Sequence, residues 1–209
     1  DAELFWIYDI LVNSNPCSIV YRYNLLVLLM RITKVTTKAG DKGSTNLGDG
    51  SLVSKSNARI CAFGSIDALN SYLGWTSVIA SSTIREDFIL IQQDLFNMGG
   101  ELSLPTEDLN LLKDDRLLWL EREIDKINET LPVLKEFILP RGNELCTRIH
   151  ICRTECRNTE RDLVKLNEVE KISPLHLKYI NRLSDYFFVL ARSVNLDSKK
   201  DEIHWDHEK

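Results

Sequence analysis

The feature of this sequence that most restricts its fold is a regular spacing of apolar residues. Between residues 114 and 131, apolar side chains recur at alternating intervals of three and four residues: Leu117, Leu120, Ile124, Ile127 and Leu131. This spacing places them on one face of an α-helix and leaves the other face polar. A half-buried strand would alternate apolar and polar residues, and no segment keeps such alternation over a sustained length. We therefore expect a helical fold.

The same spacing marks five segments that are joined by short connections. Asn143 is a suitable N-cap for the fourth segment, and Ser173 followed by Pro174 is a typical start for the fifth. Long helices with short connections predict an all-α, up-and-down five-helix bundle. The expected helices are 58–81, 83–102, 114–129, 143–167 and one that begins at Ser173 and keeps its apolar stripe to Val194.

Residues 1–29 differ in character from the rest of the chain. They lack the cationic start that is typical of a secretory signal. The apolar run from Leu25 to Met30 is too short to span a bilayer. We interpret Met30 as the native start. The expected organisation is an extension outside the native fold over 1–29, one functional domain over 30–197 and a polar C-terminal tail over 198–209.

Composition limits the classes of partner. The formal net charge of −5 argues against a general nucleic-acid-binding protein, which would usually be basic. Any anion site must therefore be a local concentration of Lys and Arg. The five cysteines are an odd number without a CxxC pair, which indicates a reducing compartment. We expect the protein to be located in the cytoplasm, or in the mitochondrial matrix if the source is eukaryotic.

A glycine-rich, cationic loop precedes the first helix, and Thr37 to Asn46 form its main part. Gly40 and Gly43 allow the backbone to turn its amides toward a ligand, and the neighbouring lysines add charge. The loop is not a Walker A motif, because Gly48 is followed by Asp49 instead of Lys. Taken alone, this loop fits either an anion site or a solvated turn.

Three arginines lie four residues apart in the fourth segment: Arg153, Arg157 and Arg161. Residues four apart share one face of a helix, so these side chains form a stripe. The fifth segment carries a matching polar stripe that begins with Asn181 and Asp185. A solvated charged face is the alternative interpretation. Together, the loop and the arginine stripe favour a polyphosphate ligand.

Several blocks of the sequence resemble, in order, those of PduO-type ATP:cob(I)alamin adenosyltransferases. The resemblance extends from Met30 to about Leu196. The blocks are residues 37–43, Lys55, 62–70, 137–140, 150–153, 156–161 and 181–185.

That resemblance implies a homotrimer of five-helix subunits with ATP bound between neighbours. It implies an intersubunit salt bridge between Asp67 and Arg153, corrin contacts from Phe137 and Asp185, and catalytic roles for Lys38, Phe137, Arg157 and Asn181. The residues implied to bind ATP are Thr37, Lys38, Ala39, Gly40, Asp41, Lys42, Gly43, Ser44, Thr45, Asn46, Lys55, Arg157, Asn158, Thr159, Glu160, Arg161 and Asn181.

The implied reaction transfers the 5′-deoxyadenosyl group of ATP to the cobalt of cob(I)alamin, and releases tripolyphosphate. ATP, Mg²⁺ and cob(I)alamin as substrate are the implied small molecules, with Mg²⁺ arriving on ATP and not on a set of protein side chains. The implied protein partners are a cob(II)alamin reductase and an adenosylcobalamin-dependent mutase, with no nucleic acid and no membrane.

Three positions depart from the pattern of that family. Asn158 stands where a second Arg is usual, Ala68 where Glu is usual, and Arg141 where the first Gly of Pro-Gly-Gly is usual. Two other classes of function remain open: a non-catalytic trimer that binds ATP or corrinoid and delivers adenosylcobalamin to a mutase, and a purely structural helical oligomer.

Overall fold

The computed structural model describes residues 38, 40–198 and 201–208. The expectations for residues 1–29, for Met30 as the start, and for Thr37 and Ala39 lie outside these residues. The chain divides into two compact units, residues 1–41 and 42–209, which we describe separately. In the first unit, the amide of Asp41 donates to the carbonyl of Lys38 at 3.4 Å, and Lys38 has a φ of 60°.

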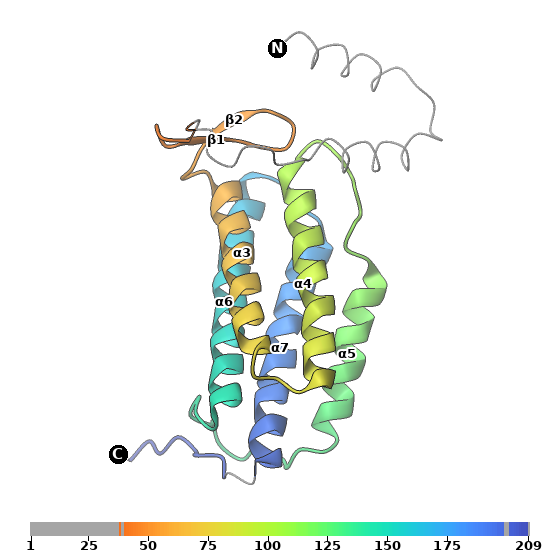
Figure 1. The fold of residues 1–209 in the computed structure, drawn as a ribbon, viewed down its shortest axis with the longest axis vertical. Coiled ribbons are helices and arrows are strands. Elements are labelled where there is room, and N and C mark those ends of the chain that lie inside the picture. The colour runs from red at the N-terminus through yellow and green to blue at the C-terminus, as the bar shows by residue number, and fades with distance from the viewer. Residues whose placement is uncertain (1–37, 39, 199–200, 209) are drawn as a thin grey trace. The chain divides into compact units, whose positions relative to one another are not determined.

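Within the second unit, five described helices form an up-and-down bundle in which successive helices run in opposite directions (Figure 1). This arrangement confirms the predicted all-α fold. The first helix is four residues shorter than expected, because Ser81 caps the second by accepting from the amide of Ile84. The helices are α3 (Ala58–Ser77), α4 (Ser82–Ser103), α5 (Asp114–Asn128), α6 (Glu144–Val169) and α7 (Pro174–Asp197).

The predicted starts of α6 and α7 are confirmed by their caps. The side chain of Asn143 accepts from the amide of Cys146 at 2.8 Å, and that of Ser173 accepts from Leu175. Pro174 is the first residue of α7, where its missing N–H costs nothing. Local sequence therefore defines where both helices begin.

A small hairpin precedes α3, and the sequence analysis did not predict it. Strand β1 (Ser44–Asn46) pairs antiparallel with β2 (Leu52–Ser54). Gly50, at φ 82°, allows the connecting turn, and the Asp49 carboxylate accepts from the amide and the hydroxyl of Ser51. Three-residue strands are too short for an alternating pattern to stand out, which explains why this segment was interpreted only as a loop.

The core lies between the inner faces of the helices. Helix α6 packs against α7 and α3, while α5 packs against α7. Cys152 and Cys156 are buried in this seam, and burial raises the pKa of each thiol. Both cysteines therefore act as small apolar core residues.

One charged cluster connects α4, α5 and α7 inside the bundle. Arg116 Nε donates to the two carboxylate oxygens of Asp94 at 3.0 and 2.9 Å, and the Tyr179 hydroxyl donates to Asp94 Oδ2 at 2.6 Å. The Arg116 guanidinium also lies 4.4 Å from the ring centre of Trp119. Burial opposes ionisation of Tyr179 and, with the nearby Asp94 carboxylate, raises its pKa well above the ordinary value.

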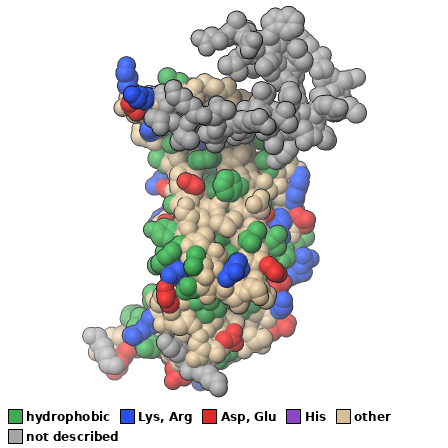
Figure 2. All heavy atoms as spheres, in the orientation of Figure 1, with side chains coloured by type: hydrophobic (Ala, Val, Ile, Leu, Met, Phe, Trp, Pro, Cys, Tyr) green, Lys and Arg blue, Asp and Glu red, His purple; other side chains and the backbone are tan. Residues whose placement is uncertain are grey.

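The face formed by α3 and α4 carries apolar side chains among charged ones (Figure 2). Phe63 and Trp75 on α3 are partly exposed, as are Ile89 and Phe96 on α4. None of the helices in the described part of the chain is long and apolar enough to cross a membrane.

Replacing Asp94 by Ala should destabilise the fold by about 3 kcal/mol, because it leaves the Arg116 guanidinium and the Tyr179 hydroxyl without their shared acceptor. Urea unfolding followed by circular dichroism, at one fixed protein concentration, measures this. The control is Glu123→Ala, which removes an exposed pair with Lys126 on one helix face and should cost under about 1 kcal/mol. Equal losses in the two variants would contradict a structural role for the buried cluster.

Candidate functional site

The arginine stripe of α6 has the geometry predicted from its spacing. Arg157 and Arg161 are exposed and Arg153 is half-buried. Burial and the neighbouring charge of Arg157 lower the pKa of Arg153. Among the described residues no ion pair neutralises Arg157, so the middle of the stripe is available to an anion.

Helix α7 meets this stripe through Asn181. The Nδ2 atom of Asn181 donates to Glu160 Oε1 at 2.9 Å. This bond joins α7 to α6 about one helical turn beyond Arg157. Asn181 is therefore held beside the stripe by a bond between the two helices. The neighbouring Asp185 pairs with Arg182 Nη1 at 2.9 Å and remains half-exposed.

Two residues of the predicted ATP segment turn inward. The Thr159 side chain is fully buried, and its hydroxyl donates to the backbone carbonyl of Ser65 on α3 at 3.1 Å. Its side chain thus packs α6 against α3. Asn158 is partly buried, and it bonds to Glu155 and to Arg161.

Asn158 and Ala68, two of the positions that depart from the family pattern, line the same cavity. This cavity of about 450 Å³ lies between α3 and α6, and Ser65 and Asp162 also line it. The Ser65 hydroxyl donates to Asp162 Oδ2 at 2.5 Å, and this bond lowers the pKa of Asp162. The structure thus brings together two departures that are far apart in the sequence.

Phe137 borders a different, more apolar cavity of about 530 Å³. Its side chain is 77% exposed, and Phe188, His150 and Arg153 also line the cavity. An apolar wall with a few polar groups is typical of a site for a small molecule. Phe188 lies on α7, while His150 and Arg153 lie on α6, so both helices contribute to this cavity.

His150 is buried beside Arg153 at this cavity. Burial, assisted by the positive charge of Arg153, lowers the pKa of His150 to about 4. The imidazole is therefore neutral near pH 7. This agrees with the packing role that its place in the bundle suggests.

Asp67 and Arg153 do not form an ion pair within the chain, as far as the described residues show. Asp67 is exposed on α3, and its side chain faces away from the core. The Nε atom of Arg153 is buried and has no hydrogen-bond partner among the described residues. Neither charge is thus neutralised by an ion pair among the described residues.

The hairpin places part of the predicted phosphate loop in a defined conformation. Ser44, Thr45 and Asn46 form β1, and the amide of Lys55 donates to the carbonyl of Gly43 at 2.9 Å. The Lys55 side chain is exposed. Gly43 has a φ of 80°, which favours glycine at this turn.

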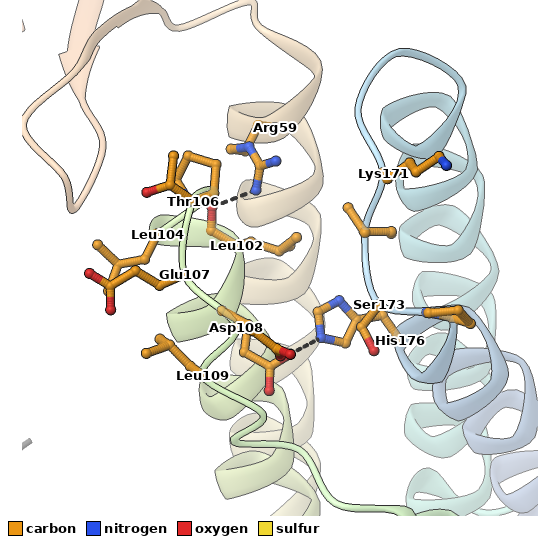
Figure 3. A pocket seen from close by; sticks show the side chains of 14 residues that line it. Arg59, Leu102, Leu104, Thr106, Glu107, Asp108, Leu109, Lys171, Ser173 and His176 are labelled. Atoms are coloured by element: carbon orange, nitrogen blue, oxygen red, sulfur yellow. Dashed lines mark hydrogen bonds and ion pairs between the residues drawn. The ribbon is translucent and has the colours of Figure 1, made fainter. Parts of the chain in front are cut away.

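A further cavity of about 460 Å³ lies near the amino end of α3, and the sequence analysis missed it (Figure 3). Arg59 spans one side of it, donating to Glu170 Oε2 at 3.0 and 2.7 Å and to the Leu102 carbonyl at 2.9 Å. His176 bonds to Glu101 at 2.5 Å. These bonds connect helix ends, so we assign them to the fold. No sequence signal distinguished Arg59 from an exposed arginine.

Glu101, which also lines this cavity, has a lowered pKa. Burial opposes ionisation of its carboxyl, but bonds from His176 and from the amides of Leu111 and Leu112 outweigh the burial, and the pKa lies below its ordinary value. The carboxylate therefore holds the segment between α4 and α5 in place. No group of three or more metal-binding side chains occurs among the residues that the structure describes.

The fold and the site define an all-α protein with a cationic helix face beside an apolar cavity. Residues 35–194 match the family described as cobalamin adenosyltransferase. The chain is 42% identical to a cobalamin adenosyltransferase of Cupriavidus metallidurans over 181 residues, which is 86% of this chain and 97% of that relative. It is 38% identical to a corrinoid adenosyltransferase of Bacillus subtilis, over 83% of this chain and 92% of that one.

Solved structures that are similar to this chain also include ATP:corrinoid adenosyltransferases. A variant PduO-type ATP:corrinoid adenosyltransferase from Lactobacillus reuteri, complexed with cobalamin and ATP, has a TM-score of 0.79 and 35% identity, and the match covers 83% of this chain and 100% of that one. A second variant of that enzyme, complexed with ATP, has a TM-score of 0.78. The chain belongs to the cobalamin adenosyltransferase family, and within it to the PduO-type corrinoid adenosyltransferases.

The lowered pKa of His150 predicts a loss of stability in acid. In the unfolded chain His150 titrates near 6.5, so between about pH 6.5 and pH 4 the unfolded state binds a proton that the folded state does not. Stability therefore falls as the pH falls through this window. From pH 7 to pH 5, the wild type should lose about 2 kcal/mol more than His150→Gln. Urea unfolding at each pH measures this, and parallel losses would show that His150 is not the responsible group.

Proposed function

We propose that the protein transfers the 5′-deoxyadenosyl group of ATP to the cobalt of cob(I)alamin, with adenosylcobalamin and tripolyphosphate as products. The observation that carries the proposal is the bond between Asn181 and Glu160, which fixes α7 beside the exposed arginine stripe of α6. Family membership supplies the class of reaction. The related Lactobacillus reuteri enzyme has been seen with cobalamin and ATP together.

The reaction needs no protein nucleophile. Cobalt(I) attacks C5′ of ATP with its electron pair, a Co–C bond forms, and the C5′–O bond breaks as tripolyphosphate leaves. The protein has to align the two substrates and stabilise the negative charge that grows on the leaving group. The residues present suit these two tasks, because they are cations, amide groups and aromatic rings.

On the phosphate side, we assign charge stabilisation to Lys38, Lys42 and Arg157. Residues 37–46 would wrap the triphosphate with backbone amides, while Lys55 and Asn181 complete the contacts to ATP. Arg161, Asn158 and Glu160 would support this face. Mg²⁺ would supply further positive charge, held mainly by phosphate oxygens and water, as is usual for Mg²⁺ bound with a nucleotide.

On the corrin side, we assign contact with the ring to Phe137 and Asp185. Phe137 is exposed at the edge of an apolar cavity, where an aromatic ring can exclude water from the lower face of the cobalt. Loss of the lower axial ligand would make Co(II) easier to reduce. A cob(II)alamin reductase would act as a partner in this reduction of Co(II) to Co(I).

We also propose a homotrimer in which Asp67 of one subunit pairs with Arg153 of the next. Asp67 is exposed, and Arg153 has a buried Nε without a hydrogen-bond partner among the described residues. The partly exposed aromatic residues on α3 and α4 offer apolar surface that an oligomer would cover. ATP would then bind between subunits. We place the protein in the cytoplasm, or in the mitochondrial matrix if the source is eukaryotic.

The second candidate is a non-catalytic trimer that delivers adenosylcobalamin to a mutase. A spectrophotometric assay with reduced cobalamin, ATP and Mg²⁺ separates the two, because only the enzyme forms a Co–C bond. We expect conversion of cob(I)alamin to adenosylcobalamin in proportion to protein. Binding of both substrates without conversion would leave the delivery function and exclude the catalytic one.

Arg157→Ala and Phe137→Ala should fail in different ways. The first removes a charge-assisted contact to phosphate, worth about 1.5–3 kcal/mol, so ATP affinity should fall about ten- to a hundredfold, and Asn181→Ala should act in the same direction. Phe137 touches no phosphate in this assignment, so its loss should spare ATP affinity and reduce turnover, most strongly when the assay starts from Co(II). Chemically prepared cob(I)alamin should restore part of the activity of Phe137→Ala and none of that of Arg157→Ala. Identical responses would contradict the division of roles.

Asp67→Ala should weaken the trimer, because removal of one member of a buried ion pair costs about 3–5 kcal/mol. Light scattering at a series of protein concentrations measures this. The matched control is Glu168→Ala, which removes an exposed carboxylate from α6 and should leave assembly unchanged. The exchange Asp67→Arg with Arg153→Asp should restore part of the assembly. A fully active Asp67→Ala monomer would rule out this interface.

A further inference from the structure

Residues 201–208, which follow α7, form a short antiparallel pairing with the segment that carries Phe137. The amide of Leu139 donates to the carbonyl of Ile203 at 2.8 Å, and the amide of Trp205 donates to the carbonyl of Phe137 at 2.7 Å. Ile138 and His204 form the bridge between these two bonds. The backbone of Phe137 is thus held by a pairing that is too short to be stable alone.

A buried arginine of α7 supplies the missing stability. Arg192 Nε donates to Glu202 Oε1 at 2.6 Å, and its Nη2 donates to Glu202 Oε2 at 3.2 Å and to the Pro132 carbonyl at 2.7 Å. Arg192 is 4% exposed, so its charge has little access to water. A two-pronged contact to a carboxylate is the strongest arrangement for such a group.

Arg192 therefore connects three parts of the chain. Glu202 brings in the C-terminal segment, Pro132 brings in the connection between α5 and α6, and α7 itself carries Phe188 four residues earlier. Phe188 and Phe137 line the same cavity. Arg192 thus anchors the segment that presents Phe137 to α7, the helix that carries Phe188.

We propose that the Arg192–Glu202 ion pair positions Phe137 for its contact with the corrin, which makes Glu202 a positioning residue of the reaction. The proposal rests on the proposed function, because it assigns Phe137 to the corrin side. Glu202 touches neither substrate and acts through the backbone of Ile203 and Trp205. Asn181, in contrast, is held by Glu160 on α6, so the phosphate side has its own support.

Glu202→Gln tests this role with little change of shape. The amide keeps one acceptor oxygen, but it turns an NH₂ donor toward the guanidinium and leaves a buried charge without its counter-ion. The matched control is Asp201→Asn, which makes the same change of charge at the adjacent, exposed residue. Hydrogen exchange in the helices serves as the check that each variant remains folded.

Two measurements on the full chain are needed. Hydrogen exchange of peptides that contain Leu139 and Trp205 should become faster in Glu202→Gln and stay unchanged in Asp201→Asn, because these two amides are donors in the pairing. In the adenosylation assay, Glu202→Gln should act in the same direction as Phe137→Ala: turnover with cobalamin should fall about tenfold, the equivalent of one lost charge-assisted bond, and the KM for ATP should stay within about twofold.

Each outcome decides one part of the proposal. Unchanged exchange in Glu202→Gln would refute the anchor. Faster exchange with unchanged KM and kcat for cobalamin would refute the positioning role. A rise in the KM for ATP by the same factor would also refute it, since a general loosening of the fold would act on both substrates. A wild type that forms no adenosylcobalamin would refute the proposed function together with the positioning role, while the exchange result would still decide whether the anchor exists.

Discussion

Two buried arginines hold the ends of the bundle, and the course of its connecting segments depends on both. Arg59, at the start of α3, binds Glu170 after α6 and the last turn of α4, while Arg192, near the end of α7, binds Glu202 and the connection after α5. Each is 4% exposed. A guanidinium in such a place requires a carboxylate and a carbonyl, because an unpaired buried charge is costly. Each arginine therefore determines where several connecting segments lie.

Between these two anchors, α6 and α7 carry several of the groups that the proposed reaction needs. Their apolar seam, which includes Cys152 and Cys156, fixes the two helices against each other. The bond between Glu160 and Asn181 then holds a polar group beside the arginine stripe, and Phe188 faces the cavity that Phe137 borders. In the proposed assignment, this helix pair therefore contributes to both the phosphate side and the corrin side. Positioning and charge stabilisation, the two demands of the chemistry, depend on a fixed arrangement of such groups.

Much of the helical fold could be predicted from the sequence, because helix periodicity and caps are local properties. The apolar spacing predicted five helices, and the caps at Asn143 and Ser173 are where the sequence placed them. The hairpin at Ser44–Ser54 was missed, since its strands are short and it is tied to the bundle by a bond from Gly48 to Ser103. The bond between the Thr159 hydroxyl and the backbone carbonyl of Ser65 was also not predicted, because Ser65 lies on another helix.

The sequence by itself determined which chemistry is available: helices with one apolar face, a stripe of arginines, and a loop of glycines and lysines. Only the tertiary structure decided which of the charged residues are accessible. Arg157 and Arg192 both lie on helices and both carry the same guanidinium, yet one is exposed and the other is buried on Glu202. The physical reason is that burial depends on contacts between residues far apart in the chain, such as Glu170 with Arg59, and no local pattern encodes these contacts.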